Sequence, residues 1–507
     1  QAQAHYQRAA RLCKEQMDPY RESRALTGMA QAFMAIGEPY RAIDKLMESM
    51  DLCKVVGDRK GECACLRFLA EAYSAVGKLP TGRKVAEQSM QLAVENGTIL
   101  EGASAHLLFA KVDVSAGKLD SAIEHLQQAR DVYAQTAVLG NNKVFLDPHA
   151  LGICLSELGY VLMRAGDCDR AREHFEQGEQ VLLAAEDGHA LATLRCRMGL
   201  LFSVVKEGAS KITAEAAETA SEKIAQSLEA SEKHGNKIGI ALCIEAQGLS
   251  WCRRGDQHKG IQKLRLALDM LRELGNKQLQ GDCLMNLGEA FLHSPQGVVH
   301  LEQCLVVRRS SADLVGEAQC LQALGSLHTY LGNTRAGTKC WQDSLNLKRE
   351  LMDEAGVKEC LQHLCALYTQ LEDYSRVSDY VGQLRDIAQA QNDFDAEAQA
   401  LIMTGRCHFN LGSLPGAEKS FKAALKICED HSKSEQLLVR EAECHDKLAT
   451  LYLQQHRNPE AKKEQEHVNR IRKKLGKDIL RPVVGPSDKG LKRKIFGLGG
   501  ALGAKAL

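Results

Sequence analysis

Cysteine is the residue type in this sequence whose number and spacing first raise the question of chemistry. There are 18 cysteines among 507 residues, and one often stands five positions before a small residue in a stretch rich in Ala and Leu, as in GDCLMNLGEAF (281–291). Thiolates in such a pattern could ligate a metal or act as nucleophiles. The cysteines in this slot are Cys65, Cys154, Cys243, Cys283, Cys320, Cys360 and Cys444.

The same slot is filled by alanine at Ala25, Ala105 and Ala400. A position that accepts either Cys or Ala favours a small buried side chain, which is how free cysteine commonly behaves. One such cysteine per repeat would also place successive sulfurs roughly 10 Å apart, too far to share a tetrahedral metal ion. We therefore predict that these cysteines are packing residues, and we expect neither a metal site nor a cofactor.

Other candidate chemistry has less support. Cys63 has a cysteine two positions later but no second pair nearby, and Cys63 and Cys168 would be open to oxidation where exposed. The stretch GLGGALGAK (497–505) lacks the G-x-x-x-x-G-K-[ST] order of a phosphate-binding loop. His328 and His408 fall where other repeats have large packing residues, and no His-Glu-x-x-His spacing occurs. The sequence predicts no catalytic residues and no enzymatic activity.

The cysteines belong to a longer pattern of small residues. A small residue, the anchor, stands seven positions before a turn glycine in seven places, and four more residues fill the same slot without the glycine. Six of the ten spacings between successive anchors are 40 residues, so the chain is built from internal repeats. The anchors are Ala30, Ala70, Ala110, Gly159, Gly199, Gly248, Gly288, Gly325, Cys365, Gly405 and Ala449.

Each repeat has the pattern of two helices. A large residue usually follows the anchor after three positions, and another small residue often returns after twelve, as at Ala42 and Ala171. This pattern predicts a first helix whose small anchor lets a second helix approach, and a turn glycine with positive φ between them. We predict an all-α fold, a right-handed α-α superhelical solenoid of about eleven helix-turn-helix repeats.

The repeats resemble those of the tetratricopeptide-repeat superfamily. Their first helix carries Leu-Gly-x-x-Tyr and their second a small residue followed by an aromatic, as in ELGYVLMRAGDCDRAREHFEQGEQVL (157–182). The resemblance covers about residues 19–476, and the 40-residue period is similar to that of the Pins/LGN and rapsyn subgroup. It implies a protein-binding surface. The residue after the anchor is never Asn, so the carboxylate clamp of tetratricopeptide co-chaperones and the Asn ladder of LGN-like proteins are both missing.

The C-terminal segment differs from the repeats. Seven basic residues against two acidic ones leave a net charge of +5 after Gly476. Such a tail is either solvated and disordered or a segment that docks on an acidic partner or an anionic surface. The docking residues would be Lys489, Lys492, Arg493, Lys494, Ile495 and Phe496.

The repeats, the tail and two interruptions of the period divide the chain into parts. We predict an N-terminal capping helix (1–18), repeats 1–3 (19–138), an inserted loop (139–148), repeats 4–11 (149–476) with an insertion near 206–218, and the basic, Gly-rich tail (477–507).

Charge and hydropathy bound the function. The 65 basic and 65 acidic residues cancel, so no large field recruits nucleic acid, and no apolar stretch is long enough for a transmembrane helix. We predict a cytoplasmic scaffold or adaptor, in a reducing compartment, that gathers protein partners on the solenoid surface. The alternative is a structural component of a cytoskeletal or ciliary assembly, associated with an axoneme or microtubules.

Overall fold

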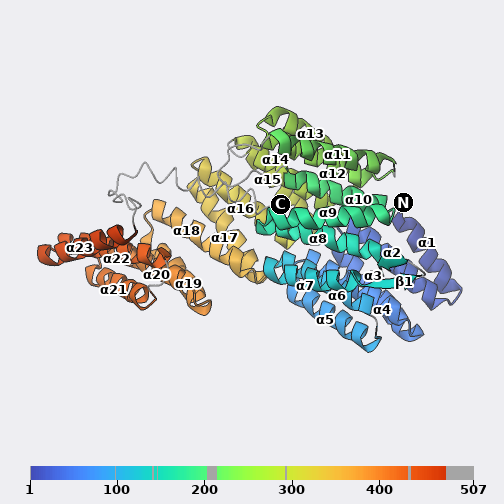
Figure 1. Ribbon diagram of the computed structural model, residues 1–507, viewed down its shortest axis with the longest axis horizontal. Helices are drawn as coiled ribbons and strands as arrows, with labels where there is room; N and C mark the ends of the chain where they lie inside the picture. The colour runs from blue at the N-terminus through green and yellow to red at the C-terminus, as the bar shows by residue number, and fades with distance from the viewer. Residues whose placement is uncertain are drawn as a thin grey trace. The chain divides into compact units, whose positions relative to one another are not determined.

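The structure, a computed structural model, is helical over almost its whole described length (Figure 1). It describes residues 2–97, 99–139, 142–145, 147–202, 214–233, 235–291, 294–431 and 435–475. Within these ranges, helix α1 (Ala2–Glu15) comes first and packs against α2, and eleven helix pairs follow it. The predicted fold class, an all-α solenoid of helix pairs, is confirmed.

The anchors of the sequence pattern lie in the first helix of each pair. The first helices are α2 (Pro19–Ala35), α4 (Arg59–Ala75), α6 (Ile99–Ser115), α8 (Pro148–Ala165), α10 (Gly188–Phe202), α12 (Lys237–Arg253), α14 (Lys277–Ala290), α16 (Leu314–Tyr330), α18 (Glu354–Gln370), α20 (Phe394–Asn410) and α22 (Glu435–Gln454). The second helices are α3 (Pro39–Val56), α5 (Leu79–Glu95), α7 (Leu119–Tyr133), α9 (Cys168–Ala184), α11 (Ala214–Lys233), α13 (Gln257–Leu274), α15 (Pro295–Ser310), α17 (Thr334–Glu350), α19 (Tyr374–Ala390), α21 (Leu414–Asp430) and α23 (Asn458–Leu475).

The described residues form two compact units. The first contains residues 2–332 together with Leu347–Asp353, and the second contains Asn333–Asn346 together with residues 354–475. Among the described residues, no helix is long and apolar enough to cross a membrane.

Helix starts follow from side chains that satisfy free backbone N–H groups. Many helices are preceded by an Asp or Asn, and Asp58 Oδ1, for example, accepts a hydrogen bond from the Gly61 amide at 3.0 Å. Asp313 caps α16 in the same way, with 2.8 Å to the Gly316 amide. These short polar residues in the connections therefore set where each helix begins.

The anchors are small because the second helix lies directly on them. A Cβ added to Gly159 would lie 2.8 Å from the ring of Phe175, and one added to Gly405 would lie 2.5 Å from the ring of Phe421. Both rings are almost fully buried, at 0% and 1% exposed. The prediction that small anchors permit close approach of two helices is confirmed.

The predicted packing cysteines are buried. All seven are at most 1% exposed, which confirms their role as small core residues. Several of their thiols also find hydrogen-bond acceptors in the preceding second helix. Cys283 Sγ donates to the Leu264 carbonyl at 3.2 Å, and Cys320 Sγ donates to the Leu301 carbonyl at 3.0 Å.

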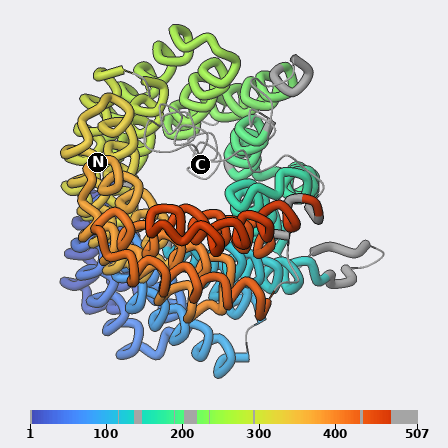
Figure 2. The backbone as a smooth tube through the Cα atoms, turned by 90° about the vertical axis from the view of Figure 1, so that its left-hand side faces the viewer, coloured from blue at the N-terminus to red at the C-terminus, as the bar shows by residue number. Residues whose placement is uncertain are grey.

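The two helices of a pair occupy different sides of the curved stack. Several successive first helices contact one another, such as α4 with α6 and α10 with α12, whereas no successive second helices in the described chain are in comparable contact. In a curved stack of helices, the helices on the inner side lie close to one another and those on the outer side lie farther apart. The first helices therefore line the inner side of the first unit, whose tube in Figure 2 turns from blue through green to yellow.

The two insertions differ in what the structure describes. Between α7 and α8, in the region expected to hold an inserted loop, β1 (Thr136–Leu139) pairs antiparallel with β2 (Asn142–Phe145), with Thr136 opposite Phe145. Residues 203–213, which contain part of the other predicted insertion, lie outside the described residues, and α11 begins at Ala214.

Within the first unit, early turns contact much later ones. At the turn glycine of α4 and α5, a Cβ on Gly77 would lie 2.9 Å from Leu314 Cβ and 3.0 Å from Leu351 Cδ2. At the next such turn, a Cβ on Gly117 would lie 3.0 Å from Asp353 Oδ1. These contacts join residues more than about 200 positions apart, far beyond one 40-residue repeat, so the first unit completes a circuit and packs against itself.

We predict that Gly77→Ala destabilises the first unit more than Gly166→Ala does. Both glycines have positive φ, 72° and 90°, so both variants carry a backbone cost of about 1 kcal/mol. Only at Gly77 would the added methyl overlap other side chains, because nothing lies within 4 Å of such a methyl at Gly166. We expect Gly77→Ala to cost about 1–3 kcal/mol more in the free energy of unfolding, measured by urea titration. If the two variants lose the same free energy of unfolding, the contact of Gly77 with Leu314 and Leu351 is contradicted.

Arg308 of α15 is a buried charge that joins three helices. It is 4% exposed, bonds Asp282 of α14, and donates through Nη1 to Asp313 Oδ2 at 2.6 Å. A Cβ on Gly281 or on Gly316 would lie 2.6 Å from its Nε, so those glycines leave space for the guanidinium.

We predict that Arg308→Met lowers the free energy of unfolding by about 3 kcal/mol, because it leaves two carboxylates without their cation. The matched control is Arg309→Met, since Arg309 is 56% exposed and pairs with Glu317. That variant should change the free energy by less than about 1 kcal/mol. If the two variants unfold at the same urea concentration, Arg308 does not have the structural role assigned to it.

Candidate functional site

A row of polar side chains follows the first helices from α4 to α14. Each of them stands next to its anchor or two or three positions before it, and helical spacing places these positions on one face of the helix. We call this set the inner row. Its members are Glu71, Lys111, Glu157, Arg197, Glu245, Asn286 and Glu289.

Three direct bonds connect neighbouring repeats along the inner row. Lys111 Nζ donates to Glu71 Oε1 at 2.6 Å. Arg197 Nη2 donates to Glu157 Oε1 at 3.0 Å, and Asn286 Nδ2 donates to Glu245 Oε1 at 2.7 Å. The paired residues are 40 or 41 positions apart, so the bonds repeat with the period of the sequence.

The α4–α10 part of the row is electrostatically satisfied. Burial alone would raise the pKa of Glu157, but the charges of Arg197 and Lys111 outweigh it and the pKa is lowered. Burial likewise opposes the charge of Lys111, yet the carboxylates of Glu71 and Glu157 raise its pKa. These four side chains therefore alternate in sign along the row, and the opposite charges shift the pKa values of Lys111 and Glu157 toward their ionised forms.

Tyr160 adds an aromatic face to this part of the row. The Arg197 guanidinium lies 4.8 Å from the centre of its ring, a cation–π arrangement, and Arg197 Nη1 also donates to Ser156 Oγ at 3.0 Å. Burial is the largest cause that raises the pKa of Tyr160, and the charge of Asp282 on α14 adds to it. The charge of Asp282 on α14 therefore acts on Tyr160 of α8, three repeats earlier in the chain.

The α12–α14 part of the row is different because its carboxyl groups make no ion pair within the described chain. Glu245 is 6% exposed, and burial, reinforced by the charge of Asp282, raises its pKa to about 8. Burial raises the pKa of Glu289 to about 7, which the charge of Arg253 only partly offsets. Burial also lowers the pKa of Arg253, which bonds the Leu200 carbonyl at 3.4 Å. Perturbed groups of this kind mark candidate functional sites.

A second polar cluster lies in the third repeat. Asp113, 1% exposed, accepts hydrogen bonds from Ser121 Oγ at 2.6 Å and from Arg83 Nη1 at 2.7 Å, and His125 Nε2 lies 3.8 Å from its Oδ2. The hydroxyl of Ser121 donates to a carboxylate and not to a histidine, so the cluster lacks the nucleophile–base bond of a hydrolase. Within the described chain, no group of three or more metal-ligating side chains is placed to hold an ion.

The structure bears differently on the individual residues that the sequence analysis singled out. Cys63 is 8% exposed, and burial raises the pKa of its thiol to about 12, so Cys63 lacks the exposure on which its oxidation was made conditional. Cys168 is half-buried, and burial raises its pKa as well. His328 and His408 are partly buried, as the packing role predicts. The tail residues Lys489, Lys492, Arg493, Lys494, Ile495 and Phe496 lie outside the described residues.

Sequence reasoning missed the inner row and two cysteine pairs. Cys304 and Cys428, on the second helices α15 and α21, lie beside the slot cysteines Cys320 and Cys444 of the following first helices. The available signal was the 16-residue separation within each pair, which links a second helix to the next anchor region. No cysteine in the described chain forms a disulfide.

Comparisons with known proteins return only distant matches. No protein-family model matches the chain. It is similar to Regulatory protein AfsR of Streptomyces griseus, with 24% identity over 336 residues, which are 66% of this chain and 29% of that protein. The chain therefore spans less than a third of that relative's length.

The similar solved structures are distant as well. The STAND protein PH0952 of Pyrococcus horikoshii, described with a tetratricopeptide repeat sensor, has a TM-score of 0.39, 11% identity and coverage of 76% of this chain and 52% of its own. The apo form of RapI has a TM-score of 0.45, 14% identity and coverage of 65% and 100%. Likenesses this distant carry no argument about function. The helix pairs and the 40-residue period from which the resemblance to the tetratricopeptide-repeat superfamily was drawn are present in the described residues.

We predict that the stability of the first unit falls as pH rises from about 5 to 8, in part because of Glu245. Its folded pKa of about 8 exceeds the ordinary value of 4.5, so the folded chain keeps a proton that the unfolded chain releases in this window. Glu245→Gln retains an acceptor for Asn286 and cannot ionise. It should remove about 2–4 kcal/mol of the pH-dependent loss.

The measurement is urea unfolding at pH 5 and pH 8, followed by Trp251 fluorescence in a Trp341→Phe background. Trp251 lies on α12, the helix of Glu245, and the chain has only two tryptophans, so the signal reports the first unit. Glu273→Gln, at an exposed position of α13, is the control and should leave the slope against pH unchanged. An unaltered slope in Glu245→Gln would contradict the prediction.

Proposed function

We propose that this chain is a non-enzymatic protein-interaction scaffold, an adaptor that holds a segment of a partner along the inner row of its first unit. The observation that carries the proposal is the contrast between the two parts of the row. Four charges from α4 to α10 are already paired, while Glu245, which is buried, and Glu289 and Arg253, which are partly buried near each other, make no ion pair within the described chain.

Burial keeps Glu245 mostly protonated at neutral pH and Glu289 partly so, and a bound segment that supplies cations would stabilise the ionised form of both carboxyl groups. The paired residues from α4 to α10 would then fix the position of the segment, because their side chains are held by one another and lose little freedom on binding. A partner would be recognised by its pattern of charge and not by a terminal carboxylate, since the Asn-based clamp is missing from the sequence.

The experiment is affinity purification from native cells with quantitative mass spectrometry. Three versions of the chain are compared: the unaltered chain, an α12–α14 variant (Arg253→Ser with Glu289→Lys), and an α9 control (Asp169→Lys with Glu176→Lys, both at exposed positions). Helical content and thermal melting are recorded for each.

We expect proteins that co-purify with the unaltered chain and with the α9 control to be depleted by at least tenfold with the α12–α14 variant. The same proteins should cross-link to α12 or α14 in the unaltered chain. Undiminished co-purification with a folded α12–α14 variant would rule out the inner row as the binding face, and turnover of a substrate by the purified chain would rule out a purely binding role.

A further inference from the structure

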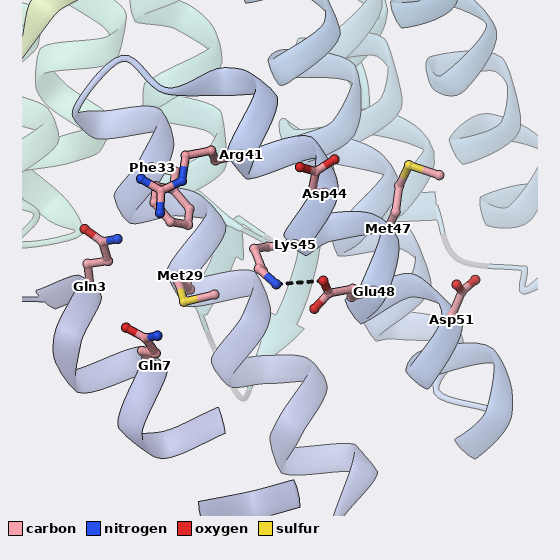
Figure 3. Close-up of a pocket in the computed structure, with 10 residues that line it drawn as sticks. All are labelled: Gln3, Gln7, Met29, Phe33, Arg41, Asp44, Lys45, Met47, Glu48 and Asp51. Carbon is pink, nitrogen blue, oxygen red and sulfur yellow. Dashed lines mark hydrogen bonds and ion pairs between the residues drawn. The ribbon is translucent and has the colours of Figure 1, made fainter. Parts of the chain in front are cut away.

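A cavity of about 500 Å³ lies between α1, α2 and α3 in the first unit (Figure 3). None of the residues that line it belongs to the inner row. Its buried apolar lining is formed by Met29 and Phe33, one turn apart on α2 and only 6% and 2% exposed. On the side of α1 it is lined by Gln3 and Gln7, also one turn apart, whose amides can donate and accept hydrogen bonds.

The cations that line the cavity are already engaged. The Arg41 guanidinium lies 4.3 Å from the centre of the Phe33 ring and donates to Glu38 Oε2 at 2.7 Å. Lys45 Nζ donates to Glu48 Oε1 at 2.6 Å, the bond drawn in Figure 3. Each cation is therefore paired with a glutamate, and neither cation is paired with the aspartates of α3 that line the cavity.

Two carboxylates of α3 have no such partner. Asp44 and Asp51 line the cavity and are exposed, and neither makes a hydrogen bond or an ion pair with any described residue. They are seven positions apart, which on a helix is two turns, about 10 Å, on one face. Between them on that face is Met47, an apolar side chain that is 48% exposed. This wall of the cavity therefore presents a carboxylate, a thioether and a second carboxylate in a line along α3.

We propose that the cavity and this face of α3 form a docking site for a basic amphipathic helix of a protein partner. The occupant is argued from charge and spacing. A helix lying along α3 with cationic side chains at positions i and i+7 would place them against Asp44 and Asp51, and an apolar side chain at i+3 or i+4 would meet Met47. Methionine adapts its shape to such contacts. The site is separate from the inner row and does not depend on the function proposed for it.

The probe is a fluorescein-labelled helix-forming peptide of about 15 residues, with Lys at i and i+7, Leu at i+3 and i+4, and Ala and Gln elsewhere. Its comparison peptide has Glu in place of both Lys residues. Binding to the full chain is followed by fluorescence anisotropy at low and at high salt. The chain is tested unaltered, as an α3 variant (Asp44→Lys with Asp51→Lys), and as the α9 control (Asp169→Lys with Glu176→Lys), whose two carboxylates have the same seven-residue spacing on another second helix.

We expect the Lys peptide to bind the unaltered chain and the α9 control alike, the α3 variant to bind it about tenfold more weakly, and salt to weaken binding. Circular dichroism and melting, recorded for both variants, confirm that they are folded. The proposal is overturned if the Glu peptide binds as well as the Lys peptide, if the α9 control weakens binding as much as the α3 variant, or if the Lys peptide does not bind.

Discussion

The close approach of each second helix to a small residue of its first helix is the contact on which the rest of this structure depends. At Gly159 and Gly405 a single added carbon would overlap an aromatic ring of the facing helix. Because the ring occupies that space, it is removed from water, and the pair becomes a rigid unit with one apolar side left for the next pair. A solenoid built this way gains its core by stacking.

Close pairing also determines which side chains remain for function. The first helices contact their successors, so long polar side chains on their inner face reach the next repeat. This is why hydrogen bonds of the inner row join residues one repeat apart, as between Lys111 and Glu71. The second helices are spread apart, so side chains such as Asp44 and Asp51 of α3 stay exposed. One packing rule thus produces two kinds of surface.

The sequence predicted what depends on a single repeat. The anchor spacing, the turn glycines and the Cys/Ala slot each follow from contacts within one pair or with its neighbour, and the structure confirms them. Properties that accumulate over many repeats could not be found in this way. The contact of Gly77 with Leu314 and Leu351 depends on the summed rotation of several pairs, which no local pattern encodes. The inner row was hidden for a related reason, since Lys111 and Glu71 follow their anchors directly whereas Arg197 and Glu157 precede theirs by two positions.

Comparison of two carboxyl groups in the inner row explains why its two parts differ. Glu157 and Glu245 occupy similar positions on first helices, and burial opposes ionisation in both. Glu157 has two cations close by and its pKa is lowered, whereas Glu245 has an amide partner and a neighbouring carboxylate, and its pKa is raised. The same fold therefore leaves one part of the row with paired charges and the other with carboxyl groups that make no ion pair within the described chain. If a partner binds the inner row, we expect cationic side chains of the partner to contribute most to the binding free energy where they lie against α12 and α14.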